Sequence, residues 1–453
     1  MIQRKFRFSS ALTASGWQRN VGLSVDENGM IESVETGVKD GTPIAGAAIP
    51  AVPNVHSHAH QRLMVGLAER AGPGADSFWT WREVMYGFAL KLSPDDLEAV
   101  AAQAYVEMLK SGFSCVGEFQ YLHHQPDGSA YDEPAEMSLR CLSAAEQAGI
   151  AVTMLPTLYN FSGFGGQPAA SGQRRFVNDA DRFLEIYETL KAVCGANPLR
   201  RLGISPHSLR AVTPELLKTV LDGIEKHARV HIHVAEQGKE VDDCLAWCGQ
   251  RPVEFLLDRF DVSSLWCAIH ATHMTPAETQ KLAESGVIAG LCPTTEANLG
   301  DGIFPADHFL KQGGTIAIGS DSHITISPAE DLRMLEYSQR LRDRTRNALA
   351  SGAGASTGRT LLDLTLKGGA ACLDQPMGAI AVGKRCAIAV LDDEHPTMAG
   401  REGDGLLDTW VFSAGNAAVK DVIVGGVHVV KDRRHSDEDR IQKRFKETVR
   451  RLS

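Results

Sequence analysis

Apolar and polar positions follow two alternating patterns along most of the chain. Between residues 48 and 318, eight short apolar runs are separated by longer stretches in which apolar residues recur at helical spacing. The runs read as strands over residues 48–54, 113–119, 151–158, 203–206, 230–234, 265–269, 287–291 and 315–318. Eight strands that alternate with helices predict an α/β protein with a (β/α)8 barrel of the TIM type rather than an open sheet.

Helix boundaries within this region carry local signals of their own. Ser93, Thr213 and Thr275 each precede a proline, a residue that suits the first turn of a helix. Gly112 and Gly149 follow the last periodic residue of a helical stretch, where a left-handed backbone often ends a helix. The pattern therefore predicts helices over residues 94–110, 134–148, 214–227 and 276–285.

The two ends of the chain show short alternating segments separated by tight turns. Turn sequences occur at residues 26–29, 39–41 and 425–426. Near the C-terminus we expect strands over residues 386–391, 409–412, 419–424 and 427–430, and helices over 362–372 and 438–452. We expect residues 1–50 and 375–453 to form one small β-sandwich domain, and residues 51–374 to form the barrel.

Composition and charge exclude several classes of function. The chain has 453 residues, 43% hydrophobic and 23% charged, as in ordinary globular proteins. A net charge of −10 argues against general nucleic-acid binding, and no apolar stretch approaches the length of a membrane span. The start has no signal-peptide pattern, and the nine cysteines are scattered, so we expect reduced thiols in a cytoplasmic protein. The expected assembly is a homodimer, without nucleic-acid or membrane partners.

Histidine or aspartate occurs at the ends of four predicted strands. His56 and His58 follow the first strand two residues apart, so they can project from the same face. His233 ends the fifth strand, His270 ends the sixth, and Asp321 follows the eighth. Since parallel barrel strands deliver their C-terminal ends to one face, these side chains should meet there.

Such a cluster predicts a metal site and a hydrolytic reaction. Three imidazole nitrogens and one carboxylate suit zinc and leave a position for water, with His56, His58, His233 and Asp321 as the ligands. The ion would lower the pKa of this water and generate a hydroxide nucleophile near neutral pH. Asp321 could accept the water's proton, Glu236 could carry protons to a leaving nitrogen, and His270 could stabilise charge on the attacking oxygen. Five other histidines stay open as alternatives: His60, His123, His124, His231 and His273.

Two arginines indicate the class of substrate. Arg82 follows the first barrel strand and Arg210 follows the fourth, each near polar residues such as Gln61, Tyr121 and His207. A guanidinium group binds a carboxylate through two parallel hydrogen bonds and is always charged. Two of them at the mouth of an acidic barrel predict a small dicarboxylate substrate. Glycine-rich loops at residues 72–74 and 161–172 lie close to strand ends and could cover such a site.

The order of these motifs resembles the amidohydrolase superfamily. His-Ser-His after the first strand, His-Val-Ala-Glu after the fifth, histidine at the end of the sixth and Ser-Asp after the eighth are similar to its deaminase and chlorohydrolase branch. The resemblance implies the same barrel, a small β domain built from both termini, and one divalent metal ion, expected to be Zn²⁺. No lysine ends the fourth strand to bridge two metals, which favours a single ion. The strand at 386–392 departs from the Ala-Asp-Leu-Val-Val-Leu-Asp that is common in the branch.

Three further stretches narrow the resemblance. Residues 54–62, 79–82 and 205–212 are similar to a deiminase family of histidine degradation that hydrolyses N-formimino-L-glutamate to N-formyl-L-glutamate and ammonia. This resemblance implies that Arg210 and His207 hold one substrate carboxylate, and that Gln61, Arg82 and Tyr121 hold the other. Which group takes the α-carboxylate stays open.

Two competing interpretations remain. The same scaffold could serve a deaminase of a purine, pterin or S-adenosylhomocysteine-type heterocycle, although such flat substrates do not need two arginines. A non-enzymatic scaffold without metal would require Glu236, His270 and Asp321 to be coincidental.

Overall fold

Eight parallel strands form the barrel. The computed structural model describes residues 4–71 and 78–452. Neighbouring strands of the barrel follow each other in chain order, namely β5 (Val52–Ser57), β6 (Phe113–Gln120), β7 (Ala151–Leu158), β10 (Arg200–Pro206), β11 (Arg229–Val234), β12 (Trp266–His270), β13 (Ile288–Leu291) and β14 (Thr315–Ile318). This topology confirms the barrel that the hydrophobic pattern predicts, and seven of the eight strands lie close to their expected positions.

The barrel closes where the end of β14 meets β5. The backbone N–H of Asp321 donates to His56 O at 3.0 Å, and the N–H of His58 donates to Asp321 O at 3.1 Å. Gly319 makes this approach possible, since a Cβ atom there would lie only 2.7 Å from His56 N. Closure of the sheet therefore fixes the Asp321 backbone beside both histidines.

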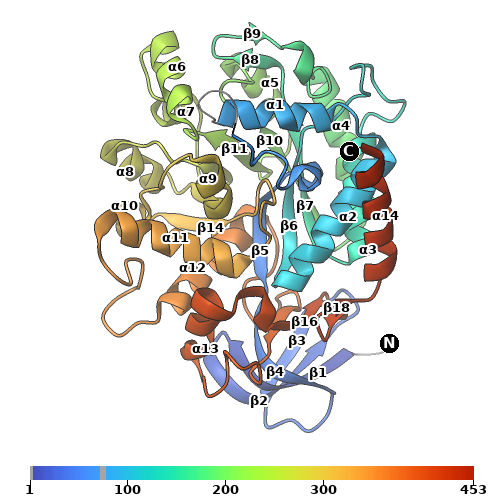
Figure 1. Ribbon diagram of the computed structural model, residues 1–453, viewed down its shortest axis with the longest axis vertical. Helices are drawn as coiled ribbons and strands as arrows, with labels where there is room; N and C mark the ends of the chain where they lie inside the picture. Colours follow the sequence, from blue (N-terminus) through green and yellow to red (C-terminus); the bar gives the residue numbers. More distant parts are fainter. Residues whose placement is uncertain (1–3, 72–77, 453) are drawn as a thin grey trace.

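Helices surround the barrel on its outside, as Figure 1 shows. In chain order they are α2 (Pro94–Ser111), α3 (Glu136–Ala148), α4 (Ala180–Gly195), α5 (Pro214–Gly223), α6 (Gly238–Cys248), α7 (Pro252–Arg259), α8 (Pro276–Glu284), α9 (Pro293–Leu299), α10 (Ala306–Lys311), α11 (Pro328–Asp343) and α12 (Thr357–Cys372). Ser93, Thr213 and Thr275 cap α2, α5 and α8 as predicted, each accepting a hydrogen bond from a backbone N–H of the first turn. Gly112 and Gly149 end α2 and α3 in the left-handed conformation.

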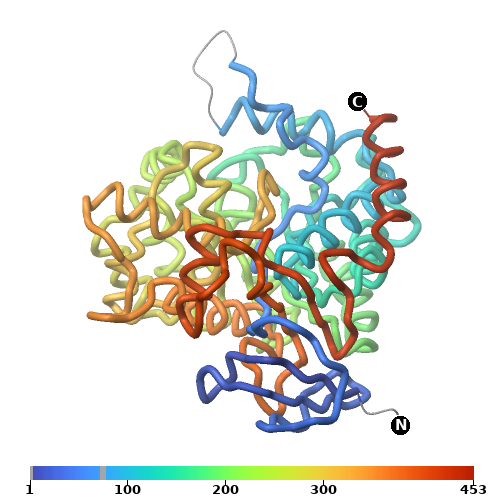
Figure 2. The backbone as a smooth tube through the Cα atoms, turned by 60° about the horizontal axis from the view of Figure 1, so that its bottom comes forward, coloured from blue at the N-terminus to red at the C-terminus, as the bar shows by residue number. Residues whose placement is uncertain are grey.

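Both chain ends contribute to a second sheet of eight strands. Its order is β18 (Arg434–His435), β17 (Val427–Lys431), β16 (Val419–Val424), β15 (Ala387–Leu391), β4 (Thr42–Pro50), β1 (Arg4–Thr13), β2 (Gly16–Val25) and β3 (Ile31–Thr36). The strands join in one hydrogen-bonded sheet, and Phe8, Leu23, Ile388 and Ile423 belong to a core of its own. This sheet lies at the end of the barrel opposite the strand C-termini (Figures 1 and 2), and α14 (Glu438–Leu452) then returns to pack against α2.

Two expected strands differ from the structure. The strand expected over residues 48–54 is divided at Ala51, because the chain leaves the small sheet at Pro50 and enters the barrel at Val52. Residues 409–412 are helical instead of extended, within α13 (Asp404–Thr409) and η3 (Trp410–Ala414), which η4 (Gly415–Ala418) follows. Trp410 and Val411 are fully buried there, so tertiary packing decides the conformation of a short apolar run that could have been either type.

The face with the strand C-termini carries the additional elements. The segments η1 (Ala59–Met64) and α1 (Phe78–Ala89) lie over it, followed by β8 (Phe161–Gly163), β9 (Gln167–Pro168) and η2 (Ser171–Gln173). The loop expected to cover the site at residues 72–74 lies outside the described residues, whereas Ser162 of the second loop lines the pocket described below. Within the described ranges, no helix is long and apolar enough to cross a membrane. All nine cysteines are free thiols.

Candidate active site

Three imidazole rings converge at the C-terminal end of the barrel. His56 lies in β5, His58 directly follows this strand, and His233 lies in β11. Their ligand atoms lie within 4.8 Å of one another, and His56 Nε2 is 3.0 Å from His233 Nε2. Asp321, after β14, adds a carboxylate whose Oδ1 is 3.4 Å from His56 Nε2 and 3.5 Å from His58 Nε2.

Hydrogen bonds behind the rings orient them toward a common centre. His58 Nδ1 lies 2.9 Å from Phe119 O, and His233 Nδ1 lies 2.9 Å from His207 O. A ring nitrogen that faces a carbonyl oxygen must donate its proton, so each Nε2 keeps a free lone pair. Metal-binding histidines typically have this arrangement of outer partners.

The buried cluster fits a divalent metal ion. Burial lowers the pKa of His56 to about 3 and lowers the pKa values of His58 and His233, so all three rings are neutral near pH 7. Burial opposes ionisation of Asp321, but its contact with His56 keeps the pKa of this carboxyl below its usual range. Three neutral nitrogens and a carboxylate that face each other at these distances form the donor set that zinc-type ions use.

His270 lies beside the imidazole cluster and contacts three carboxylates. Its Nε2 lies 3.7 Å from both Asp321 Oδ2 and Glu236 Oε1, and its Nδ1 lies 3.2 Å from Glu296 Oε1. Burial alone would lower the pKa of His270, but Glu236, Glu296 and Asp321 together raise it to about 10. Burial also raises the pKa of Glu236, although His270 and Arg210 oppose this effect. Glu236 and His270 can therefore hold protons beside the imidazole cluster at neutral pH.

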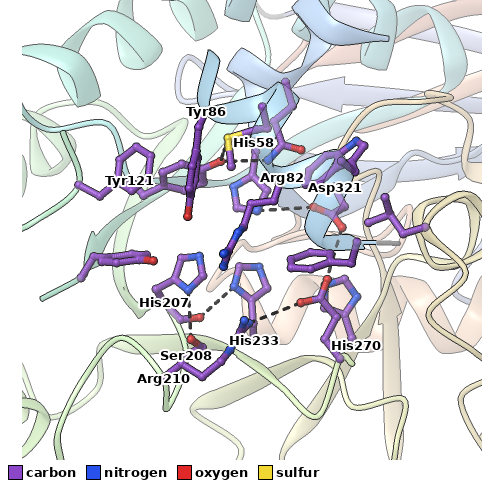
Figure 3. A pocket seen from close by; sticks show the side chains of 18 of the residues that line it. His58, Arg82, Tyr86, Tyr121, His207, Ser208, Arg210, His233, His270 and Asp321 are labelled. Carbon is purple, nitrogen blue, oxygen red and sulfur yellow. Dashed lines mark hydrogen bonds and ion pairs between the residues drawn. The ribbon is translucent and has the colours of Figure 1, made fainter. Parts of the chain in front are cut away.

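A pocket adjoins this cluster, and Arg82 and Arg210 are among the residues that line it (Figure 3). Within the described part of the chain, Arg82 Nε, Arg210 Nε and Gln61 Oε1 are buried without hydrogen-bond partners. Arg82 lies over the ring of Trp79 at 4.5 Å, and Arg210 lies 5.8 Å from the same ring. Buried donors without acceptors are costly, so the two guanidinium groups could bind an anionic group, whereas Gln61 Oε1 could accept a hydrogen bond.

The structure brings together every residue that the sequence predicted for the site. Ten of them line the pocket, and the eleventh, His56, lies directly behind it in contact with His233 and Asp321. The ten are His58, Gln61, Arg82, Tyr121, His207, Arg210, His233, Glu236, His270 and Asp321.

The alternative histidines have other partners. His231 lies deeper in β11 and contacts Cys372 O at 3.0 Å, and His60 contacts the hydroxyl of Tyr121 at 2.8 Å. His123, His124 and His273 each contact a backbone carbonyl. These contacts give one nitrogen of each ring a hydrogen-bond partner other than a metal ion.

Sequence reasoning missed several residues of the site. Glu296 holds His270, and Glu240 accepts backbone hydrogen bonds beside Glu236, but neither belongs to a motif at a strand end. Aromatic residues from α1 and the barrel loops also line the pocket, among them Tyr86, Tyr159 and Phe176. Their contribution depends on how the loops fold, which periodicity does not reveal.

The chain belongs to the amidohydrolase family, whose family model matches residues 47–429. Members of this family are typically metal-dependent, which agrees with the imidazole cluster. Among curated proteins, formimidoylglutamate deiminase of Pseudomonas aeruginosa is 51% identical over 437 residues, which cover 96% of each chain. A 5-methylthioadenosine/S-adenosylhomocysteine deaminase of Natronomonas pharaonis is 27% identical and covers 85% of this chain and 81% of its own length.

Solved structures give the same assignment of fold. An amidohydrolase from Brucella melitensis superposes with a TM-score of 0.94 at 46% identity, covering 99% of this chain and 100% of its own. An adenosine deaminase from Xanthomonas campestris, solved with bound zinc, superposes with a TM-score of 0.82 at 20% identity, covering 99% and 98%. At that identity, the second likeness concerns the fold alone.

Proposed function

We propose that this protein is a formimidoylglutamate deiminase that hydrolyses N-formimino-L-glutamate to N-formyl-L-glutamate and ammonia. The observation that carries the proposal is the pair of arginines with unpartnered buried nitrogens in the same pocket as the imidazole cluster. A substrate with two carboxylates and one amidine carbon satisfies both parts of this pocket. The name and 51% identity of the Pseudomonas aeruginosa relative support the same substrate.

The residues around the pocket divide into two groups for binding. In this proposal, Arg210 and His207 hold one carboxylate of the substrate, while Gln61, Arg82 and Tyr121 hold the other. The hydroxyl of Tyr121 accepts a hydrogen bond from Gln61 Nε2 at 3.0 Å, so these two side chains act as one polar surface. Two bound carboxylates fix the position of the formimino carbon, which lowers the entropic cost of reaction.

We assign the metal ligands as His56, His58, His233 and Asp321, with Zn²⁺ as the ion that best suits three imidazoles and one carboxylate. A divalent ion bound there would supply Lewis-acid chemistry and lower the pKa of a water molecule.

The chain's own groups account for the movement of protons. Hydrolysis adds the oxygen of water to the formimino carbon and releases its terminal nitrogen as ammonia. Asp321 accepts a proton from the attacking water, and His270 donates a hydrogen bond to the developing oxygen charge. Glu236, whose pKa is raised by burial, delivers a proton to the leaving nitrogen.

Glu240 does not line the pocket, but it positions Glu236 and Arg210. This fully buried carboxylate accepts the backbone N–H of Ala235 at 3.0 Å and that of Glu236 at 3.1 Å. Ala235 has a positive φ of 51°, so these bonds hold a strained turn in place. Glu240 also lies 4.0 Å from Arg210 Nη2, which is itself 3.8 Å from Glu236 Oε2. Glu240 therefore aligns Glu236, the proposed proton carrier, and weakens the attraction of Arg210 for the Glu236 carboxylate.

The substrate assignment is tested by ammonia release from N-formimino-L-glutamate and from formamidine, which has no carboxylate. We expect Arg82→Met to reduce kcat/KM for N-formimino-L-glutamate by roughly 10²-fold or more, because a substrate carboxylate loses its desolvated partner. Turnover of formamidine should change little. Arg82 is the cleaner variant, since Arg210 also contacts Glu236. A wild-type enzyme that ignores N-formimino-L-glutamate but deaminates a purine or pterin would refute the assignment.

Glu236→Gln tests the proton carrier. The amide cannot deliver a proton, so we expect kcat to fall by about 10²-fold or more while the metal content stays unchanged. Turnover and metal content should be measured on the same preparation. Loss of the metal in this variant would instead make Glu236 a ligand, and full activity would remove its proposed role.

Glu240→Gln tests positioning. One backbone N–H would then face the side-chain amide, so we expect kcat to fall by roughly tenfold, with a smaller change in KM. The pH dependence of kcat should also shift, because Arg210 would lose one of its two carboxylates. Asp242→Asn, an exposed position on the same helix, is the matched control and should behave as wild type. An unchanged kcat and pH profile in Glu240→Gln would contradict the positioning role.

A further inference from the structure

Ser57 lies between two of the proposed metal ligands, His56 and His58, but its hydroxyl has a different environment. Because side chains alternate along a strand, this hydroxyl points away from the face that carries the two rings. Ser57 Oγ donates to Glu118 Oε2 at 2.6 Å and lies 3.0 Å from His323 Nε2. A hydroxyl that gives its proton to a carboxylate can only accept from the ring, so His323 Nε2 carries a proton.

The other ring nitrogen of His323 contacts the opposite side of the site. His323 Nδ1 lies 3.0 Å from the hydroxyl of Ser320, the residue directly before Asp321. The ring is 0% exposed, which favours its neutral form, so Nδ1 accepts a hydrogen bond from Ser320. Ser320 Oγ in turn accepts from Asn54 Nδ2 at 2.6 Å. One directed chain of hydrogen bonds therefore crosses the ring, from the Asp321 side of the site to the side of Ser57.

Backbone hydrogen bonds hold His323 in an unusual conformation. Its φ is 60°, in the left-handed region that residues with a Cβ atom rarely adopt. The N–H of His323 donates to Ser320 O at 2.9 Å, and Arg62 Nη1 donates to His323 O at 2.7 Å. Arg62 also pairs with Glu107 at 2.7 Å, which fixes the guanidinium itself. Strain that the surrounding bonds maintain points to a role for the side chain.

The hydrogen bonds of His323 cross the seam at which β14 meets β5. Ser57 and Asp321 form an isolated parallel β-bridge at the same place. Glu118 anchors one end, since its Oε1 also accepts the N–H of Ala59 at 2.8 Å. We call the three central side chains the seam clasp, formed by Ser57, Ser320 and His323. None of the three is among the described residues that line the pocket, so the clasp acts from behind the proposed ligands.

We propose that His323 is a positioning residue for the metal site. Through the two serines of the seam clasp, it holds the segment of His56 and His58 in register with Asp321. The ligands then face one another before an ion binds, so less binding energy is spent on ordering them. Groups that orient metal ligands from behind typically change metal affinity by about 10- to 100-fold. The proposal rests on the assignment of these ligands, but not on the substrate.

The rate of zinc release tests this role directly. Zinc-loaded enzyme is mixed with excess pyridylazoresorcinol, a chelator that changes colour when it captures the ion. We expect His323→Asn to release zinc roughly tenfold faster than the wild type or more, with kcat for ammonia release reduced and KM little changed. Asparagine tolerates a left-handed backbone, and its amide oxygen can still accept from Ser320. The side chain is too short to reach Ser57, so the link across the seam is lost.

His435→Asn is the matched control. His435 is a buried histidine of β18, and its ring nitrogens contact Ala148 O at 2.9 Å and the N–H of Asp437 at 3.1 Å. Its loss should lower the melting temperature of the metal-free protein, measured by circular dichroism, without changing the rate of zinc release.

The outcomes separate this proposal from the assignment of the metal ligands. Zinc release at the wild-type rate from His323→Asn would overturn the positioning role alone. Equally fast release from His435→Asn would also overturn it, because lost stability would then explain both variants. A wild type that retains no zinc would overturn the metal ligands together with this proposal.

A double-mutant cycle tests whether His323 acts through Ser57. Ser57→Ala removes only a hydroxyl, and it should also accelerate zinc release. If both residues act through one hydrogen bond, the variant with both substitutions should release zinc little faster than the faster single variant. Multiplication of the two effects, or no effect of Ser57→Ala, would contradict action through this bond. Ser57→Ala also tests the proposal should His323→Asn fail to fold.

Discussion

Closure of the barrel between β14 and β5 is the interaction on which the site depends. It places the backbone of Asp321 between those of His56 and His58, through hydrogen bonds of 3.0 and 3.1 Å. The same closure brings a carboxylate to within 3.5 Å of two imidazole nitrogens that burial keeps neutral. Three lone pairs and a negative charge that face each other in a buried site are unfavourable unless a cation joins them. Closure of the barrel thus forms a site that fits a metal ion.

Two cationic side chains beside the imidazole cluster, His270 and Arg210, each lie between carboxylates. His270 lies between Glu236, Glu296 and Asp321, and these carboxylates keep its pKa high despite burial. Arg210 has a comparable position between Glu236 and Glu240. Each cation is therefore shared between at least two carboxylates. In the proposed reaction, binding of a substrate carboxylate to Arg210 would weaken its attraction for Glu236, which would link recognition of the substrate to proton transfer.

Much of the fold and the site could be predicted from the sequence, because strand ends carry their chemistry in short motifs. His56, His58 and Asp321 follow directly from the rule that parallel strands deliver their C-termini to one face. Glu240 and Glu296 could not be predicted in this way, since their roles come from hydrogen bonds to the backbone of Glu236 and to the ring of His270. The helical conformation of residues 409–412 was missed for a related reason. A four-residue run with three apolar side chains fits a strand or a helix equally well, and only the burial of Trp410 and Val411 distinguishes the two.

The most direct test of this account is the amount of divalent metal per chain, measured by plasma mass spectrometry on gently purified protein. The account predicts one ion per chain in the wild type, and far less than one in His58→Ala and in Asp321→Ala. Removal of the ion with a chelator should abolish ammonia release, and added zinc should restore it. A wild-type protein that contains no divalent ion, and whose turnover neither chelation nor zinc affects, would contradict the central claim.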